Sequence, residues 1–311
     1  DLQANFVLDW RNPYRRGTGL TAVHNEVIKS PSNLVCRTAK SVVFKRCTFN
    51  KLGGGGIDLE YGSQNNAIVG CTFRDISGSA VQVGDVLKDD HHPDDPRKTV
   101  KDNAVVNNYI RDCGVEYWGS VGVFAGYTDG TVIAHNEICD LPYTAISVGW
   151  GWGEEDVGGG REDYQQPFKY QTPTSSKNNR IEYNHIQGAI SKTDDGAAIY
   201  TLGNQPGTVL RGNHIHDCRN SSSKRGWSSG IYFDEGSGFI ECTANVVYKV
   251  PIVVSYNNLV QDRKATCKVH DNLFENGFEG SPPGAIETNA AKSIIEKAGL
   301  EAEYEDLLKT Q

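Results

Sequence analysis

The chain has 311 residues, a formal net charge of −8 and no methionine. An acidic balance without a Lys- or Arg-rich face argues against nucleic acid as a partner. No apolar run approaches the ~20 residues of a membrane helix, so we expect no membrane association either. A chain without even an initiator methionine is expected to be a processed piece of a longer precursor, missing an N-terminal portion.

A short repeat organises most of the chain. Residues 1–35 show few strand signals and are expected to form a loop-rich cap or a truncated coil. Beyond them a unit recurs: an apolar strand, then Asn or Cys, then any residue, then Ile, Phe or Val. Its instances are Val42–Phe49, Ile68–Phe73, Val105–Ile110, Val132–Ile138, Ile181–Ile186, Val209–Ile215, Glu241–Val247 and Cys267–Phe274. The shortest interval between units sets the length of one coil, and the longer intervals indicate insertions.

A second strand follows most of these units, usually after a glycine or another small residue. It reads apolar, variable, apolar, the period of two of a strand with one face turned inward. The examples are Ile57–Leu59, Val81–Val83, Val121–Val123, Ile146–Val148, Ala198–Tyr200 and Ile231–Phe233. Such coils predict an all-β solenoid over residues 1–289, a single-stranded right-handed parallel β-helix. The recurring Asn is expected to bond its neighbours along the stack, which is a structural role.

An insertion at Asp85–Thr99 interrupts the coils and contains two adjacent histidines, His91 and His92, among four carboxylates. Such a group could bind a metal ion, but adjacent histidines rarely direct both rings at one ion. We therefore expect a solvated acidic loop whose histidines contact the substrate or the scaffold, with no metal and no cofactor. Further along, Glu116 and Tyr117 precede an outward strand and are expected to line a cleft.

Two tryptophans lie in a glycine-rich run at the start of a second insertion, which reaches about Lys177. The glycines around Trp150 and Trp152 would let each indole lie flat and exposed, the geometry that stacks on the apolar face of a sugar ring. A structural wedge against the neighbouring loop is the alternative, and sugar contact is the favoured interpretation.

Two acidic pairs lie on successive coils. Asp194-Asp195 precedes the strand that contains Tyr200, and Asp234-Glu235 follows the next strand of the same kind. Cleavage of a glycosidic bond needs two carboxyl groups, one that protonates the leaving oxygen and one that attacks or activates water. Crowding by a second carboxylate favours the protonated acid, which makes Asp195 the expected proton donor. Solvated turn residues are the alternative.

The C-terminal residues 290–311 are expected to form an amphipathic helix packed on the last coil, because an open solenoid needs covered ends. The apolar residues at near-helical spacing are Ile294, Ile295, Ala298, Leu300, Tyr304, Leu307 and Leu308.

Several side chains are expected to have structural roles. Cys47 and Cys71 occupy the same repeat position, where they could form a disulfide or a simple thiol stack, and the stack is slightly favoured. His214 and His216 flank an anchor isoleucine, so at least one of them is expected to be a stacked structural histidine.

The glycosylation acceptor pattern Asn220–Ser222 is weak support for a secreted, extracellular protein.

Five motifs are found together in this chain: His91–Pro96 (HHPDDP), Gly114–Tyr117 (GVEY), Ala145–Gly153 (AISVGWGWG), Asp195–Gly203 (DGAAIYTLG) and Gly230–Gly236 (GIYFDEG). With these motifs the sequence resembles glycoside hydrolase family 141, from about residue 33 to the final helix. The GWGWG run is the most specific part of the match.

The resemblance implies a right-handed parallel β-helix with α-L-fucosidase or xylanase activity on plant or algal polysaccharides. We expect the chain to act on its carbohydrate substrate as a monomer. By motif, the family's pair of catalytic aspartates falls on Asp195 and Asp234. Substrate contacts are expected from Trp150, Trp152, His91, His92, Glu116, Tyr117, Tyr200 and Glu235. Family members are usually much longer, with more sequence ahead of this region.

The strand alignment bears on this pair of aspartates. If Ile199 aligns with Ile231, Asp195 precedes one strand and Asp234 follows the next, about 20 Å apart on extended backbone. A working pair needs about 5–9.5 Å. Either the turn before the strand folds back, or the register differs, or Glu235 or Asp194 is the partner.

Three rival functions remain open on the same fold. A Ca²⁺-dependent polysaccharide lyase would use clustered carboxylates and a Lys or Arg base, and a chelator would abolish its activity. A pectin-type hydrolase is suggested by Asp194-Asp195, but its other motifs are missing. A non-catalytic glycan-binding β-helix would keep its affinity when either aspartate is replaced.

Overall fold

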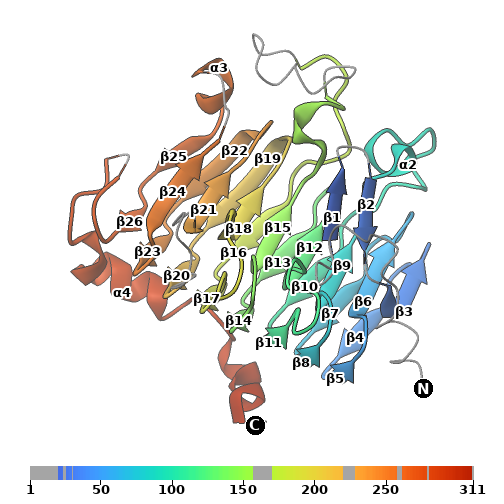
Figure 1. Ribbon diagram of the computed structural model, residues 1–311, viewed down its shortest axis with the longest axis horizontal. Coiled ribbons are helices and arrows are strands. Elements are labelled where there is room, and N and C mark those ends of the chain that lie inside the picture. The colour runs from blue at the N-terminus through green and yellow to red at the C-terminus, as the bar shows by residue number, and fades with distance from the viewer. Residues whose placement is uncertain are drawn as a thin grey trace.

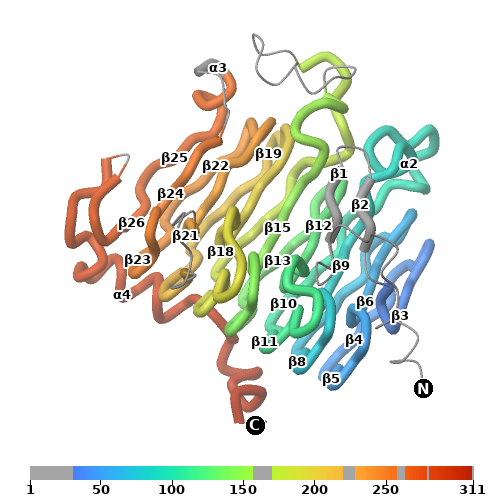
Figure 2. The backbone as a smooth tube through the Cα atoms, viewed as in Figure 1, coloured from blue at the N-terminus to red at the C-terminus, as the bar shows by residue number. Residues whose placement is uncertain are grey.

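The computed structural model describes residues 20–23, 26–29, 31–156, 170–219, 228–257, 261–278 and 280–309. Three parallel sheets of eight strands each make up its body (Figure 1). Each coil contributes one strand to each sheet in turn, and the tube trace follows this winding from one end to the other (Figure 2). The arrangement agrees with the predicted parallel β-helix, and the sense of winding stays a prediction.

The N-terminal part begins with an antiparallel pair, β1 (Leu20–Val23) and β2 (Glu26–Lys29). The next strand, β3, already belongs to a parallel sheet. Residues 1–19 of the predicted cap lie outside the described residues.

The first sheet contains the strands that the apolar-variable-apolar pattern predicts. They are β3 (Ser32–Arg37), β6 (Gly55–Glu60), β9 (Val81–Val83), β12 (Val123–Ala125), β15 (Ile146–Val148), β18 (Gly196–Thr201), β21 (Ser228–Phe233) and β24 (Ile252–Tyr256). One element differs from the prediction, because β12 begins at Val123. Val121 is buried instead in a separate apolar cluster with Phe124 and Trp150, outside the coil core.

The second and third sheets contain the two halves of the recurring unit. The second sheet comprises β4 (Val43–Lys45), β7 (Ala67–Val69), β10 (Ala104–Val106), β13 (Val132–Ala134), β16 (Arg180–Glu182), β19 (Asn204–Arg211), β22 (Gly238–Thr243) and β25 (Lys268–His270). The third sheet comprises β5 (Thr48–Leu52), β8 (Thr72–Ile76), β11 (Tyr109–Cys113), β14 (Glu137–Cys139), β17 (His185–Gln187), β20 (His214–His216), β23 (Val246–Tyr248) and β26 (Leu273–Phe274).

The register of the third sheet matches the repeat. Its strands align the last residue of each unit, in the order Phe49, Phe73, Ile110, Ile138, Ile186, Ile215, Val247 and Phe274. All of these from Phe73 onward are fully buried. The ladder therefore buries one apolar side chain per coil, which is how a solenoid builds its core from identical small steps.

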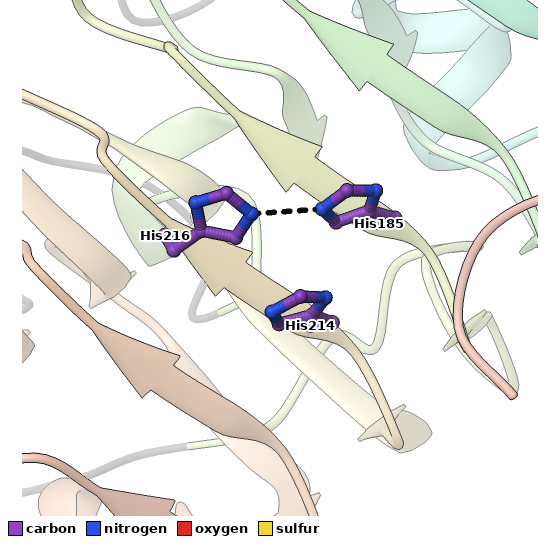
Figure 3. A group of neighbouring side chains, drawn as sticks. All are labelled: His185, His214 and His216. Carbon is purple, nitrogen blue, oxygen red and sulfur yellow. Dashed lines mark hydrogen bonds between the residues drawn. The ribbon is translucent and has the colours of Figure 1, made fainter. Parts of the chain in front are cut away.

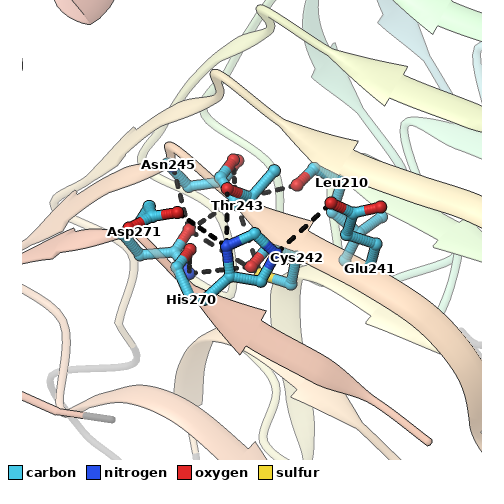
Figure 4. A network of polar contacts seen from close by, with 8 residues as sticks. Leu210, Glu241, Cys242, Thr243, Asn245, His270 and Asp271 are labelled. Carbon is cyan, nitrogen blue, oxygen red and sulfur yellow. Dashed lines mark hydrogen bonds and ion pairs between the residues drawn. The ribbon is translucent and has the colours of Figure 1, made fainter. Parts of the chain in front are cut away.

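The recurring asparagines form a hydrogen-bonded ladder beside this core. The backbone N–H of Asn136 (3.1 Å) and its side-chain amide (2.9 Å) both donate to the side-chain oxygen Oδ1 of Asn184 on the next coil. The side-chain amide of Asn184 in turn donates to the main-chain oxygen of Ile133 at 2.9 Å. Figure 4 shows the last part of the ladder, where Asn245 bonds the main-chain oxygen of Leu210. The structural interpretation of these residues is confirmed.

All eight cysteines are free thiols, so the thiol stack and not the disulfide describes Cys47 and Cys71. Burial raises the pKa of the Cys71 thiol to about 11, which keeps it protonated and unreactive.

The long insertions leave the C-terminal ends of first-sheet strands. Residues 84–103 follow β9 and contain α2 (Lys88–His91), and residues 149–179 follow β15 and contain η1 (Gly151–Gly153). Residues 257–267 follow β24 and contain α3 (Gln261–Lys264). The described parts of these insertions, which include α2 and α3, lie along one long edge of the solenoid (Figure 1). None of the described helices is long and apolar enough to cross a membrane.

The C-terminal segment differs from the expected single helix. Beyond η3 (Ala285–Glu287), a first helix, α4 (Asn289–Ile295), lies beside β23, and a second, η4 (Ala302–Lys309), follows a bend at Gly299. Residues 299–309 form a strap that runs back along the earlier coils, where Arg46 binds the Asp306 carboxylate at 2.8 Å. The apolar face of η4 thus covers the side of the solenoid. Residues 310–311 lie outside the described residues.

Candidate active site

The two predicted catalytic aspartates flank neighbouring first-sheet strands, and two tyrosines connect them. In the register, Tyr200 on β18 pairs with Tyr232 on β21, next to Ser255 on β24. The rings of Tyr200 and Tyr232 lie 5.2 Å apart at nearly a right angle. Because inward and outward side chains alternate, these tyrosines stand on the outer face of the sheet, opposite the apolar ladder.

Asp234 directly follows β21 and is 6% exposed. Its carboxylate accepts the hydroxyl of Tyr200 on one oxygen and the side-chain amide of Asn257 on the other, at 2.8 Å. Burial raises the pKa of Asp234 above its usual value, and the two donors, which favour the ionised form, offset only part of this shift. The group therefore meets the requirement for an acid that holds its proton closer to neutral pH.

Asp195 directly precedes β18, in a left-handed backbone conformation with φ of 57°. Its carboxylate accepts the hydroxyl of Tyr232 at 3.3 Å. Its main-chain oxygen accepts the hydroxyl of Tyr143 at 2.8 Å. Two tyrosines from neighbouring coils thus fix this aspartate at the start of its strand.

The tyrosines resolve part of the geometric objection raised by the strand alignment. The register is the one assumed, with Ile199 opposite Ile231. Each phenol, however, hydrogen-bonds the aspartate at the end of the other tyrosine's strand, and the two tyrosine rings are in contact. Both carboxylates therefore belong to one cluster of side chains that is built around the two tyrosines. Burial raises the pKa of the Tyr143 hydroxyl, and the negative charges of Asp195 and Asp234 raise it further. Tyr143 therefore lies near both carboxylates.

A small cavity adjoins this cluster. It has a volume of about 220 Å³ and is lined by Ser229, Tyr232, Ile252, Ser255, Tyr256 and Asn257. Hydroxyl and amide groups dominate its polar lining, a composition that suits a ligand rich in hydroxyl groups.

The tryptophans occupy different positions from those expected. Trp150 is only 5% exposed, with its ring 5.7 Å from that of Phe124, so it is the structural wedge and not an open platform. Trp152 is partly exposed and packs edge-to-face on Trp150 at 5.2 Å. It adopts a left-handed φ of 52°, between two glycines that are also left-handed. Trp152 alone retains the predicted surface character.

The two histidines of the acidic loop connect it to the tryptophan loop. His91 is buried at the end of α2, with its Nδ1 2.6 Å from that of His92 and its Nε2 3.6 Å from a Glu155 oxygen. His92 bonds the main-chain oxygen of Thr172 at 2.9 Å. Burial lowers the pKa of His91 despite Glu155. The three side chains form a potential ligand group for a metal ion.

The hollow beside these histidines is separate from the one at Tyr232. It has a volume of about 390 Å³ and is lined by residues that include His91, His92, Lys101, Asp129 and Lys177. None of its lining residues belongs to the Asp195–Asp234 cluster or lines the cavity at Tyr232, so the two histidines border a different hollow from Tyr232 and Asn257.

The remaining predicted residues are divided between surface and interior. Glu116 is exposed and Tyr117 partly buried in the loop before β12. Glu235 is 7% exposed, directly after Asp234. Trp118, which received no role from the sequence, lies in the same loop as Glu116. Its side chain is 46% exposed, and the Lys192 ammonium lies 4.9 Å from its ring centre.

Sequence reasoning also missed Tyr143, Tyr232 and Asn257 as partners of the aspartates. Only Tyr232 carried a signal, because it repeats the position of Tyr200 one coil later. Tyr143 and Asn257 lie in turns between strands, where the repeat pattern says nothing about side-chain direction.

Replacing Tyr200 by Phe should destabilise the protein more at neutral than at acidic pH. The lost hydroxyl favours ionised Asp234, so the variant raises the pKa of that carboxyl further. A hydrogen bond to a buried charge is worth about 2 kcal/mol, and its loss should be fully felt only above the folded pKa of Asp234. Urea unfolding of both proteins at pH 3 and pH 7 measures this, with Tyr61→Phe as control. An equal penalty at both pH values would contradict it.

Comparison with known proteins finds a likeness among solved structures. No protein-family model and no curated protein sequence matches the chain. A solved structure described as "Glycoside hydrolase" is similar over 90% of this chain, with 28% sequence identity and a TM-score of 0.69. The chain spans 42% of that protein's length. The likeness supports a relationship of this chain to glycoside hydrolases.

Proposed function

We propose that this protein hydrolyses a glycosidic bond through Asp234 and Asp195. The observation that carries the proposal is the buried Asp234, whose raised pKa suits an acid, in one tyrosine cluster with a second carboxylate. The preferred substrate is an α-L-fucoside of a plant or algal polysaccharide, as in the family that the motifs resemble. A xylan is the second candidate, because that family also contains xylanases.

The roles of the two aspartates follow from their surroundings. Asp234 protonates the leaving glycosidic oxygen, because burial disfavours its charged form. Asp195, which accepts a hydroxyl at 3.3 Å, acts as the nucleophile or as the base that activates water. This exchanges the roles expected from the sequence, where Asp194 was to keep Asp195 protonated.

The proposed location follows from this substrate class. A polymeric glycan is met outside the cell, so we propose that the protein is secreted. We also propose that it works as a monomer. The acceptor pattern Asn220–Ser222 would fit this location and lies outside the described residues.

A screen of aryl glycosides tests the proposal. We expect hydrolysis of the fucoside above the xyloside, arabinofuranoside and galactoside, undiminished by a chelator. An unsaturated product that disappears with chelation would favour the polysaccharide lyase. Glycan binding without turnover of any of these substrates, in this chain and in the longer precursor, would favour the non-catalytic solenoid.

Replacing Trp152 by Ala should raise KM for the productive glycoside roughly tenfold with a smaller change in kcat. Stacking of a sugar on an indole contributes on the order of 1.4 kcal/mol, and it acts on the bound substrate as much as on the transition state. Steady-state kinetics measures the effect. The control is Tyr61→Ala, whose ring packs against Arg37 on an early coil. An unchanged KM in the Trp152 variant would remove this residue from the site.

A further inference from the structure

Three histidines gather on the outer face of the third sheet, away from the Asp195–Asp234 cluster. His185 is on β17, and His214 and His216 are on β20, the next strand of that sheet (Figure 3). The rings of His185 and His214 are stacked at 4.5 Å. The Nε2 atoms of His185 and His216 face each other at 2.9 Å (Figure 3).

Carboxylates fix the tautomers of the two facing histidines. The Nδ1 of His185 lies 2.8 Å from a Glu137 oxygen, and the Nδ1 of His216 lies 2.7 Å from an Asp217 oxygen. A carboxylate can only accept, so each Nδ1 carries the proton. Both Nε2 atoms are then left with bare lone pairs only 2.9 Å apart, and two lone pairs repel at this distance. A positive species must lie between them, either a proton or a metal ion.

The pairing of the two nitrogens with the carboxylates behind them favours the metal ion. Each of the two histidines presents its Nε2 lone pair to the other and has a carboxylate oxygen at its Nδ1. An imidazole with a free lone pair is the form that binds metals.

We propose that His185 and His216 bind a divalent transition-metal ion of the zinc class through their Nε2 atoms. Two imidazole nitrogens at about 2.0–2.1 Å from one ion lie about 2.9–3.4 Å apart for angles between 90° and tetrahedral, which includes the 2.9 Å found here. A carboxylate behind each ligating histidine is the usual arrangement that orients such ligands. Glu137 and Asp217 also place two negative charges beside the ion, and the charge of Asp217 is shared with the Lys249 ammonium 3.6 Å away.

The third histidine can complete the site only by turning. His214 is within reach, since the three possible ligand atoms lie within 4.8 Å of one another. Its ring is parallel to that of His185 within 7°, however, so one ion cannot lie in both ring planes as they stand. A rotation of His214, which gives up its 3.0 Å contact with the Tyr248 hydroxyl, would supply the third nitrogen. Water would fill the remaining coordination position of the ion, because the side chains of His185 and His216 are partly exposed to solvent.

The ion would tie neighbouring coils to each other beneath the C-terminal strap. β17 and β20 belong to successive coils, so the ion adds a cross-link between them. Gly299 of the strap packs closely on this site, because a Cβ there would lie 3.1 Å from both Glu137 and His185. The backbone N–H of Gly299 donates to the main-chain oxygen of Tyr183 at 2.8 Å. The role of the site is thus structural.

Zinc binding to purified, chelator-stripped protein tests the proposal. The starting protein is His92→Ala, which removes a ligand from the other potential group of His91, His92 and Glu155. We expect this variant to bind one equivalent of Zn²⁺ in calorimetry and to gain thermal stability from it. Adding His216→Ala should weaken binding at least ~100-fold, and adding Asp217→Asn instead should weaken it about 10–100-fold.

Replacing Zn²⁺ by Cu²⁺ gives a second readout, because nitrogen hyperfine coupling in the electron paramagnetic resonance spectrum reports histidine ligands. The signal should be present in His92→Ala and lost with His216→Ala. If His216→Ala fails to fold, the Asp217→Asn result decides. No zinc binding to His92→Ala, or equal affinity with and without the Asp217 substitution, would overturn the proposal and leave a shared proton between the imidazoles.

Discussion

Asp234→Asn should lower kcat for the productive glycoside at least ~10²-fold while leaving the fold intact. Asparagine keeps the size of the side chain but has no transferable proton, so general acid catalysis is lost. Its amide oxygen can still accept the hydroxyl of Tyr200, and its NH2 group then faces the side-chain amide of Asn257, which must flip to present its oxygen. KM should change little, because the sugar contacts remain. Steady-state kinetics and far-UV circular dichroism measure these two expectations.

A leaving-group test separates the acid from its partner. An aryl glycoside with an acidic phenol needs little protonation, so Asp234→Asn should be less impaired on it than on one with a basic leaving group. Asp195→Asn should lose at least ~10²-fold on both substrates. The control is Asp271→Asn, at an exposed turn where the carboxylate bonds only His270 among the contacts described. Full activity of either active-site variant would remove that aspartate from the mechanism, with Glu235 the next candidate.

Much of the fold could be predicted because each coil repeats the same local requirement. One apolar residue and one asparagine or cysteine at a fixed place in each coil leave a periodic trace, so the alignment of Ile110 with Ile138 could be read from spacing alone. The strap shows the limit of such patterns. The apolar spacing of Tyr304 and Leu307 indicates that a face is covered, but not which part of the molecule covers it.

The site was less predictable because it depends on side-chain direction in turns. Glycines around Trp150 and Trp152 permit either an exposed or a buried indole, and tertiary packing on Phe124 decided for Trp150. The separation of Asp195 and Asp234 was estimated along the backbone, whereas the contacts between them run through tyrosine side chains about 6 Å long. Neither effect leaves a periodic signal.

Asn184→Ala should lower the free energy of unfolding by about 4 kcal/mol. The change leaves the backbone N–H of Asn136 and the main-chain oxygen of Ile133 without the partners they have at 3.1 and 2.9 Å. Each buried group that loses its partner costs about 1–3 kcal/mol, and the small cavity left by the amide adds to this. A loss of this size is a large share of the ~5–15 kcal/mol stability of a typical domain.

Urea unfolding of the wild type and the Asn184 variant measures this loss. Asn50→Ala is the matched control, because Asn50 is exposed on β5 of the same sheet and its loss should cost less than about 0.5 kcal/mol. Asn213 bonds Asn245 and Ile181 in the same way, so Asn213→Ala should cost a similar amount. If both ladder variants unfolded like the control, water would have replaced the lost bonds, and the apolar ladder alone would hold the coils in register.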